Sequence, residues 1–398
     1  MNKLNLRDLS LKGKRVLMRV DFNVPLNKEG TISDDSRIQA SLPSIQYILD
    51  QGASLVLMSH LGRPKAKFDS SLSLAPCAKR LSELLGQKVQ LAPDCIGPVV
   101  KQMALELKPK EVLLLENVRF HAGEETPEVD PTFAEQLAEL GDVYVNDAFG
   151  TAHRAHASTA LIAKLFPGHA AAGFLMEKEV QALRILICDP TRPFYAVIGG
   201  SKISTKIGLI QNLLKSVDAL FLGGGMLFTF MKAQGVEIGN SLVELDSLET
   251  AKIILAKAKK DQLHFPIDLV IADGFSNEAS TRVILAKEGI PAGWQGLDVG
   301  PQTVKEWSSE LANAATVFWN GPVGVFEMSH FAEGTKGIAA SLATSKGRVI
   351  VGGGDSVAAI ERLGLSNQFY HLSTGGGASL EYLEYGHLPG IDALTSLS

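Results

Sequence analysis

The segment VIVGGGDSVAAI, residues 349–360, decides the fold class of this chain. It begins as a continuous apolar strand, passes through three glycines at 352–354, and continues into a helix that opens with Asp355 and Ser356. Glycines at such a turn let backbone N–H groups approach a phosphate, and a helix N-terminus favours negative charge. The segment contains no lysine, however, and the phosphate-loop pattern G-x-x-x-x-G-K-[ST] is absent from the chain. Any positive charge for phosphate chemistry must therefore come from other segments.

The composition is typical of a globular protein with large apolar cores. Its 398 residues are 45% hydrophobic and 20% charged, which suits two ordinary domains or one large one. A net charge of −5 argues against a broadly basic nucleic-acid surface, and the three cysteines follow no C-x-x-C pattern that would indicate a disulfide framework or a zinc site. The start of the chain lacks an apolar signal segment, and residues 219–231 are too few and too glycine-rich to span a membrane. We expect a cytoplasmic protein without nucleic-acid or membrane partners.

Short apolar runs recur along the whole chain, and they are continuous rather than alternating, as strands buried on both faces are. Amphipathic helical patterns lie between them, for example in residues 204–217 and 131–140. Strands that alternate with helices indicate an α/β fold with mostly parallel sheets, and so many strands favour two sheets. A helical stretch without a strand, at 173–190, predicts a connector between two α/β domains. The apolar runs are 15–20, 54–58, 111–115, 142–145, 194–198, 218–222, 268–272, 316–319 and 348–351.

The residues that follow the strands differ between the two halves. Ligands of open α/β sheets bind at the carboxyl ends of the strands, so these positions report on function. In the first half they are rich in Arg, His, Asn and Asp, which suits a small, multiply charged anion. In the second half they are mostly glycine, which suits the phosphates and flat base of a nucleotide. An anion domain and a nucleotide domain together predict phosphoryl transfer. The first set is 21–23, 59–63, 116–120 and 146–156, and the second is 199–202, 223–226, 272–274, 320–327 and 352–356.

On long motifs that run from end to end, the sequence resembles the phosphoglycerate kinase family. The motifs include RVDFNVPL (19–26), SRIQASLPSI (36–45), SHLGRPK (59–65), LLLENVRFHAGEE (113–125), NDAFGTAHRAHAST (146–159), GGSKISTKI (199–207), FLGGGMLFTF (221–230), WQGLDVGPQT (294–303), WNGPVGVFE (319–327) and HLSTGGGASLEYLE (371–384).

This resemblance implies two Rossmann-like domains with parallel-sheet cores. Residues 1–173 would bind 3-phosphoglycerate, residues 174–192 would form a hinge helix, and residues 193–387 would bind the nucleotide. The tail, 388–398, would return to the first domain. The implied reaction is reversible phosphoryl transfer between 1,3-bisphosphoglycerate and MgADP, giving 3-phosphoglycerate and MgATP in glycolysis and gluconeogenesis. Hinge bending would close a monomer on its small-molecule substrates.

Carried over to this chain, the resemblance places the phosphoglycerate on the first domain. Asp21 and Asn23 would hold the glycerate hydroxyl and carboxylate end, and Arg37 would counter charge at the acyl-phosphate end. The clamp on the non-transferred phosphate would be His60, Arg63, Arg119 and Arg154. No general base is needed, because a mixed anhydride transfers its phosphoryl group without activation of an alcohol.

The resemblance also assigns the nucleotide side. Lys202 and Lys206 would approach the nucleotide phosphates, and Asp355 would be the Mg²⁺ ligand. The cleft would be lined by Gly223, Gly224, Gly225, Gly296, Asn320, Pro322 and Glu327, with Glu327 at the ribose hydroxyls. The phosphates and metal would be held by Gly353, Gly354, Asp355 and Ser356, and a second helix N-terminus would be offered by Gly375, Gly376 and Gly377. The catalytic set would be Arg37, Lys202, Gly354 and Gly376.

Three positions depart from the commonest family pattern. Ser201 stands where alanine is frequent, and Ser356 replaces a frequent threonine but keeps the hydroxyl. Gln302 stands where lysine is frequent, which lowers positive charge near the nucleotide and bears on its affinity.

Several structural alternatives remain open at the level of sequence. Asp355 could be only a helix cap, and the glycine runs could be only tight turns. His153 and His156 have a metal-like spacing, but no third ligand is near them in the sequence. A two-lobed anion-binding protein and a nicotinamide-dependent dehydrogenase are rival functions, although the dinucleotide fingerprint is missing.

Overall fold

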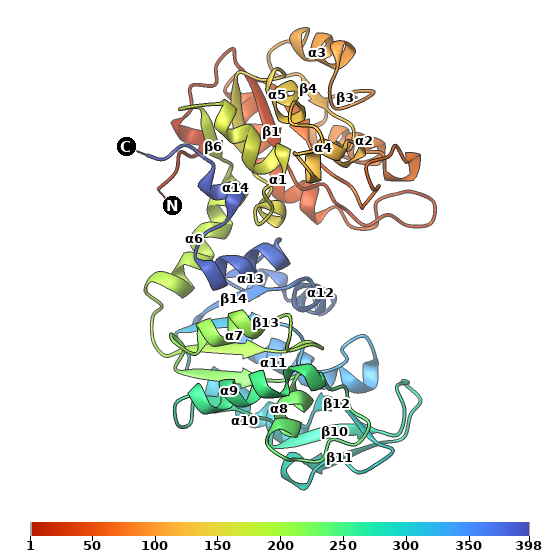
Figure 1. Cartoon of the computed structure of the whole chain (residues 1–398), viewed down its shortest axis with the longest axis vertical. Coiled ribbons are helices and arrows are strands. Elements are labelled where there is room, and N and C mark those ends of the chain that lie inside the picture. The colour runs from red at the N-terminus through yellow and green to blue at the C-terminus, as the bar shows by residue number, and fades with distance from the viewer. Residues whose placement is uncertain (1, 398) are drawn as a thin grey trace. The chain divides into compact units, whose positions relative to one another are not determined.

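The computed structural model describes residues 2–397, and its contacts divide the chain into two compact units. The N-unit comprises residues up to Gln181 together with the tail from His387, and the C-unit comprises Ala182–Gly386. Helix α6 (Phe174–Cys188) carries the chain from the first unit to the second (Figure 1). It occupies most of the connector predicted at 174–192.

The N-unit is built on a six-stranded parallel sheet with strand order β3-β4-β2-β1-β5-β6. The central strands are buried on both faces, which explains their continuous apolar sequences. Strands β3 and β6 have no counterpart among the predicted runs, because β3 is interrupted by the polar Gln90 and β6 consists of three alanines. The strands are β1 (Arg15–Arg19), β2 (Ser54–Met58), β3 (Val89–Leu91), β4 (Val112–Leu114), β5 (Val143–Asn146) and β6 (Ala170–Ala172).

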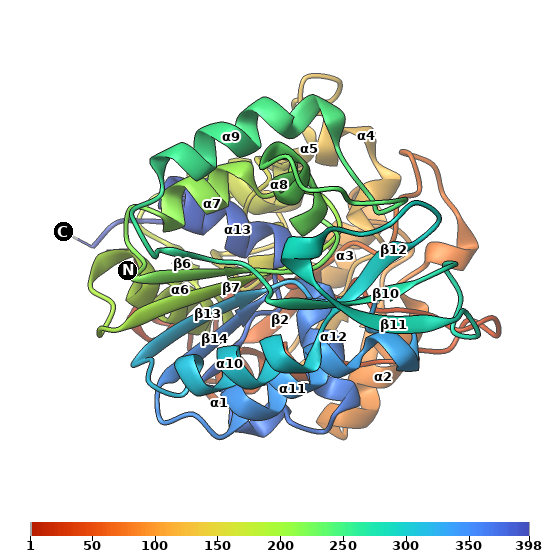
Figure 2. The same cartoon turned by 90° about the horizontal axis from the view of Figure 1, so that it is seen from below.

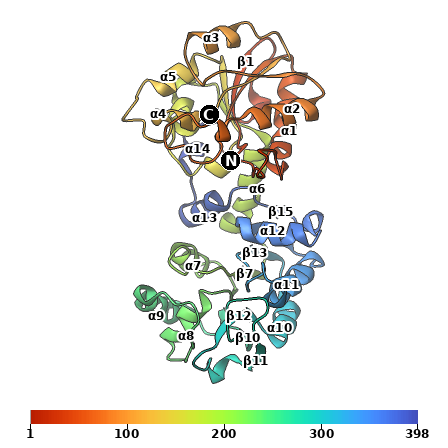
Figure 3. The same cartoon turned by 90° about the vertical axis from the view of Figure 1, so that its right-hand side faces the viewer.

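Helices cover both faces of this sheet. Figure 3 shows α1 and α2 on one side of β1 and α4 and α5 on the other. Alternate residues of β1 point to opposite faces, and Val16 and Met18 join the core under α1 and α2. The α-helices are α1 (Ser36–Asp50), α2 (Ala75–Leu85), α3 (Pro98–Leu105), α4 (Ala122–Glu125), α5 (Phe133–Ala138) and α14 (Pro389–Asp392). Shorter 3₁₀ and π segments are η1 (Leu6–Asp8), η2 (Ser70–Leu72), η3 (Val118–Phe120), η4 (Phe149–Thr151), η5 (Ala157–Leu161) and η6 (Ile162–Leu165).

The C-terminal tail packs on the N-unit. The Thr395 N–H donates to the Ala170 carbonyl at 3.0 Å, which extends the edge of the sheet beyond β6. The Lys3 ammonium donates to the Asp392 and Leu394 carbonyls at 2.7 and 2.8 Å. These carbonyls lie at and just beyond the carboxyl end of α14, where a positive charge is favourable.

The C-unit is built on a second six-stranded parallel sheet, of order β15-β14-β13-β7-β8-β9. Figure 2 shows α7, α8 and α9 over one face of this sheet and α10 and α11 over the other. Its core contains Trp307 of α10, which packs edge-on against Phe221 of β8 with ring centroids 5.4 Å apart. The strands are β7 (Phe194–Ile198), β8 (Ala219–Leu222), β9 (Leu263–His264), β13 (Thr316–Asn320), β14 (Arg348–Gly352) and β15 (His371–Leu372).

The C-unit helices complete the strand–helix alternation that the opening segment predicted, since β14 leads directly into α12. The α-helices are α7 (Ile207–Leu213), α8 (Leu227–Ala233), α9 (Leu248–Lys257), α10 (Pro301–Leu311), α11 (Glu333–Ala343), α12 (Gly354–Arg362) and α13 (Gly376–Tyr385). The 3₁₀ segments are η7 (Leu245–Ser247), η8 (Ala286–Glu288), η9 (Ser329–Phe331) and η10 (Ser366–Gln368). None of the helices in the described part of the chain combines the length and apolar character needed to cross a membrane.

A small antiparallel sheet differs from the expected parallel arrangement. The apolar run at 268–272 forms β10 (Asp268–Ala272), which pairs antiparallel with β11 (Thr281–Leu285) and β12 (Gln295–Val299). Most of β11 is exposed, as an edge strand of an antiparallel sheet can be. A short apolar run does not specify the direction of its partners, so sequence alone could not separate this strand from the others.

Candidate active site

The strand-end loops of the N-unit bring Asp21, Arg37 and His60 together. Asp21 follows β1 and His60 follows β2, and neighbouring parallel strands end at the same edge of a sheet. The Arg37 Nη1 donates to Asp21 Oδ2 at 2.8 Å, and His60 Nδ1 lies 4.0 Å from Asp21 Oδ1. Burial alone would raise the pKa of Asp21, but nearby positive charge outweighs it and the net shift is downward. Asp21 is therefore an ionised carboxylate at neutral pH.

His60 is neutral in this cluster. Burial lowers its pKa well below 6.5, and Arg19, Arg119 and Arg37 lower it further against the opposing effect of Asp21. Besides His60, Arg37 and Arg19 lower the pKa of Asp21, and these guanidinium groups stay charged whatever the state of the imidazole. A neutral imidazole can donate one hydrogen bond to a ligand without adding charge.

The loop after β2 is cross-linked to the segments on either side of it. The Gly62 N–H donates to Asn23 Oδ1 at 2.8 Å, and Arg119 Nη1 donates to the Gly62 carbonyl at 3.1 Å. Gly62 has φ +60°, and a Cβ there would lie 2.7 Å from a methyl carbon of Leu72, so a glycine is required. These bonds place Asn23 and Arg119 beside Asp21 and His60.

Arg63 and Arg154, the remaining predicted clamp residues, have exposed side chains. Arg154 Nε donates to the His153 ring at 3.0 Å, and the Arg154 charge helps to lower the pKa of His156. Burial is the larger cause, and the pKa of His156 falls to about 3. His153 and His156 thus belong to a strongly cationic neighbourhood, which disfavours a metal ion there.

Arg19 is a site residue that the sequence analysis missed. It is fully buried at the end of β1, where its Nε donates to Ser158 Oγ at 2.7 Å and its Nη2 lies 3.3 Å from His60 Nδ1. Its charge faces the buried Glu124 carboxylate, 3.9 Å away, which also accepts hydrogen bonds from Ser158. An arginine at the end of an otherwise apolar strand is the signal that could have found it, because such a charge needs partners.

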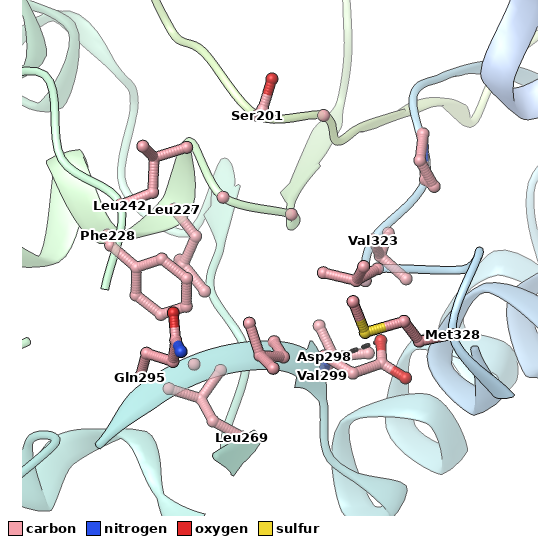
Figure 4. Close-up of a pocket in the computed structure, with 18 of the residues that line it drawn as sticks. Ser201, Leu227, Phe228, Leu242, Leu269, Gln295, Asp298, Val299, Val323 and Met328 are labelled. Atoms are coloured by element: carbon pink, nitrogen blue, oxygen red, sulfur yellow. Dashed lines mark hydrogen bonds between the residues drawn. The ribbon is translucent and has the colours of Figure 1, made fainter. Parts of the chain in front are cut away.

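The C-unit contains a cavity of about 700 Å³ at the ends of its strands. Figure 4 shows Phe228 and Leu242 on one side of it and Val323 and Met328 on the other, so apolar side chains face the cavity from both sides. Sequence reasoning missed these apolar residues, because an apolar side chain gives the same sequence pattern whether it faces a core or a ligand. Six predicted nucleotide residues line the cavity: Gly224, Gly225, Gly296, Pro322, Glu327 and Asp355.

Gly296 and Gly224 are needed for the shape of this cavity. A Cβ on Gly296 would lie 2.2 Å from the Phe228 ring, and a Cβ on Gly224 would lie 2.5 Å from the Gly200 nitrogen. Gly224 also has φ +68°. Neither position can carry a side chain without movement of the cavity wall.

Two helix N-termini lie next to each other beside the cavity. A Cβ on Gly376, the first residue of α13, would lie only 3.4 Å from the nitrogen of Gly354, the first residue of α12. Ser356 Oγ accepts the Gly321 N–H at 2.6 Å, which fixes α12 against the loop after β13. Adjacent helix N-termini favour an anion.

The same region offers polar groups that lack a structural role. The N-cap of α12 is Gly353, with φ +92° and no side-chain cap bond, so Asp355 is not the helix cap. Among the described residues, the buried Asn320 Nδ2 has no hydrogen-bond partner, and it faces the Cβ position of Gly353 at 2.9 Å. Both groups are available to a ligand.

The two predicted phosphate lysines occupy different environments. Lys206 Nζ donates to the Gly199 carbonyl at 2.5 Å and to the Asn320 carbonyl at 3.1 Å. Burial lowers the pKa of Lys206 to about 8, against the opposing effect of Asp355. Lys202 is exposed, and its charge helps to keep the pKa of Glu244 low.

Of the departures from the family pattern, Ser201 lines the cavity and Gln302 does not. Gln302 is exposed in the first turn of α10, where its N–H donates to Asp268 Oδ2 at 3.0 Å. A lysine at this position would add charge at the surface rather than in the wall of the cavity.

Comparison with known proteins identifies the family. The family model described as phosphoglycerate kinase matches residues 6–386. The chain belongs to the phosphoglycerate kinase family. A phosphoglycerate kinase of Moorella thermoacetica is 54% identical over 397 residues, covering 99% of this chain and all of the relative, and that of Chloroherpeton thalassium is 54% identical over the full length of both.

Solved structures agree with this assignment. The phosphoglycerate kinase of Coxiella burnetii has a TM-score of 0.88 at 43% identity, and that of Pyrococcus horikoshii has a TM-score of 0.85 at 32% identity. Each comparison covers 98% of both chains. The chain is therefore a kinase with phosphoglycerate kinase function, a transferase of glycolysis, and its substrates are small molecules that include a nucleotide. The rival functions of binding protein and dehydrogenase are set aside.

Asp298, in the cavity wall, makes the free energy of unfolding depend on pH. Burial raises its pKa to about 7, although the Gly334 and Val299 N–H groups donate to its oxygens at 2.7 and 2.9 Å. The folded pKa lies above the ordinary value of 3.8, so the native state holds an extra proton between about pH 4 and pH 7. This contribution stabilises the fold at low pH and is lost as the pH rises through 7.

We predict that Asp298→Asn removes this dependence. As the pH rises from about 5 to about 8, the free energy of unfolding of the wild type should fall relative to that of the variant. Urea unfolding followed by tryptophan fluorescence measures this in the C-unit, which holds all three tryptophans. Asp246→Asn, at an exposed acid, is the control. Parallel pH profiles of wild type and Asp298→Asn would contradict the prediction.

Proposed function

We propose that the two units divide the phosphoglycerate kinase reaction between them. The N-unit binds 3-phosphoglycerate or 1,3-bisphosphoglycerate, and the C-unit binds ADP or ATP. The observation that carries this division is the contrast between the two strand edges. One gathers arginines around the ionised Asp21, and the other forms an apolar cavity beside two helix N-termini.

On the N-unit, each predicted residue has a role that its surroundings support. Asp21 and Asn23 hold the glycerate hydroxyl and carboxylate end, and Arg37 reaches the acyl phosphate. The non-transferred phosphate is held by His60, Arg63, Arg119 and Arg154. His60, being neutral, donates to this phosphate, while the arginines supply the charge. Arg19 acts as a positioning residue, because its guanidinium lies against His60 from a fully buried position.

On the C-unit, the base stacks between the apolar walls and Glu327 accepts the ribose hydroxyls. Gly223, Gly224, Gly296, Asn320 and Pro322 shape the remainder of the cleft. The phosphates lie at the N-termini that begin with Gly354 and Gly376, where Gly353, Ser356 and Lys206 adjoin them. Lys202, on an exposed loop, moves with the transferring phosphoryl group.

Asp355 is proposed as the protein ligand of Mg²⁺. Its carboxylate lines the cavity, is not used as a helix cap, and is the type of oxygen donor that Mg²⁺ prefers. The ion would neutralise the phosphate oxygens of the nucleotide.

The chemical step needs charge neutralisation more than covalent help. The bond between phosphorus and the carboxylate oxygen of 1,3-bisphosphoglycerate breaks, and a bond to a terminal oxygen of ADP forms. The carboxylate is a stable leaving group, so the step needs no general base. Arg37, Lys202 and the helix N-termini meet the negative charge of the phosphoryl group in transfer.

We predict that Arg37→Ala and Lys202→Ala each lower kcat by a factor of about 10³ or more, because each removes positive charge from the transferring group. The assay mixes the protein with ATP, Mg²⁺ and 3-phosphoglycerate and measures ADP and acyl phosphate. Arg80→Ala and Lys252→Ala are matched controls, since both side chains make surface ion pairs. Turnover near the wild-type rate in either test variant would refute that residue's role.

Asp355→Asn should raise the Mg²⁺ concentration that catalysis requires. Activity measured against Mg²⁺ at fixed ATP should require a higher Mg²⁺ concentration for half-maximal rate, because a neutral amide is a poorer ligand for the ion. Glu249→Gln, at an exposed acid in the first turn of α9, is the control. An unchanged Mg²⁺ requirement in Asp355→Asn would assign the metal to other groups.

Because the two substrates are bound by different units yet exchange a phosphoryl group, we propose that hinge bending brings the units together in the ternary complex. Closure also excludes water and limits hydrolysis of the acyl phosphate. Both half-sites come from one chain, which supports a monomeric enzyme. We propose that it acts on small molecules in the cytoplasm.

Small-angle scattering should give a smaller radius of gyration with both substrates than with either one alone, at a molecular mass of one chain. The nucleotide alone and 3-phosphoglycerate alone serve as controls. An unliganded protein already as compact as the ternary complex would rule out closure.

A further inference from the structure

A cluster of three potential metal ligands lies in the N-unit apart from the groups used above. Asp94 and Cys95 follow β3, and His121 follows the short helix after β4, the neighbouring parallel strand. One oxygen of Asp94, the Cys95 sulfur and one ring nitrogen of His121 all lie within 4.8 Å of one another. Their sequence spacing matches no zinc motif, and the pairing of β3 with β4 brings them together.

The side chains of this cluster are already oriented. His121 Nε2 lies 2.5 Å from Asp94 Oδ1, and the His121 ring stacks on Phe133 with centroids 5.0 Å apart. The Cys95 thiol is buried and donates to the Glu116 carbonyl at 3.0 Å. A ligand set held in place by packing loses little entropy when it binds an ion.

The charge around the thiol also favours a cation. Burial is the largest cause that raises the pKa of the Cys95 thiol, and the carboxylates of Asp94, Glu124 and Glu116 raise it further against the opposing charge of Arg19. A cation beside the thiol would offset these negative charges. About half of the Asp94 side chain is exposed, at 49%, and 25% of His121, so solvent reaches the cluster from one side. An ion could arrive there with a bound water.

We propose that Asp94, Cys95 and His121 form a binding site for a soft divalent cation of the zinc class. The ligands are the Cys95 thiolate, His121 Nε2 and an Asp94 oxygen, with a water molecule on the exposed side as the fourth. Ligand atoms around one zinc ion lie about 3.3–3.8 Å apart, so the imidazole and carboxylate separate by about 1 Å on binding. The thiol proton is released to solvent.

The site adjoins the segment that presents Arg119. His121 lies between Arg119, which pairs with Glu125 at 3.1 Å, and α4, which contains both Glu124 and Glu125. An ion on His121 therefore tethers this segment to the loop after β3. We expect it to raise the melting temperature of the protein.

The test uses the full-length protein freed of metal with a chelator and titrated with Co²⁺, a spectroscopic substitute for Zn²⁺. The proposal predicts one equivalent bound per chain, a thiolate-to-cobalt charge-transfer absorption in the near ultraviolet, and displacement of the cobalt by Zn²⁺. Cys95→Ser should abolish this absorption, and His121→Gln should weaken binding about tenfold or more.

Cys77→Ser and Cys188→Ser are the matched controls and should retain the absorption. Cys77 is a second buried thiol of the N-unit, which donates to the Phe22 carbonyl at 3.7 Å, and Cys188 is exposed. If Cys95→Ser does not fold, Asp94→Asn tests the site independently, because its side chain is half exposed. It should weaken cobalt binding as His121→Gln does. The proposal is overturned if the wild type shows no thiolate absorption, if Cys95→Ser keeps it, or if His121→Gln and Asp94→Asn bind cobalt as tightly as the wild type. The cluster would then be only an ion pair beside a buried thiol.

Discussion

The buried positive charge of Arg19 is the constraint on which the N-unit site depends. A guanidinium without solvent is costly unless its donors are bonded and its charge is matched. Ser158, Glu124 and His60 provide those partners from three different segments of the chain. Each of these segments is thereby fixed relative to the end of β1. Arg37 and Arg119, which are proposed to bind the substrate, lie close enough to this network to lower the pKa of His60.

This network also explains how a strongly cationic site holds a histidine and a carboxylate in useful states. Burial and the arginines lower the pKa of His60, and Arg37 and Arg19 also lower the pKa of Asp21, since positive charge favours an anion and disfavours a second cation. The candidate site of the C-unit depends less on charged side chains than on the shape of its cavity. There the backbone of the glycine loops and the ends of α12 and α13 face the region where phosphates are proposed to bind.

The sequence predicted the parallel sheets because strands buried on both faces must be continuously apolar. It did not predict β3, which is interrupted by a polar residue, or β6, which consists of three alanines. It predicted the strand β10 but not its antiparallel partners, because an apolar run does not specify the direction of the neighbouring strands. The charged and glycine motifs predicted two candidate sites, one at the strand ends of the N-unit and one at the strand ends of the C-unit. Arg19 was overlooked although a charge at the end of an apolar strand is a signal of burial, because its partners come from distant segments of the chain. Phe228 was overlooked because a cavity wall and a core have the same apolar pattern. The ligands around Cys95 meet only through strand pairing, which no local pattern encodes.

The tail has a consequence for biosynthesis. Thr395 bonds to Ala170 and the Lys3 ammonium caps carbonyls at the end of α14, so the first and last segments of the chain meet in one unit. The ribosome must therefore synthesise the whole C-unit before the tail from His387 can pack on the N-unit. Until then the Ala170 carbonyl of β6 and the Lys3 ammonium lack these partners, although Asn5 can already pair with Ala172. Because the two ends of the chain are adjacent, joining them and opening the chain at an exposed loop should be tolerated, and would let the N-unit be completed in one uninterrupted stretch of translation.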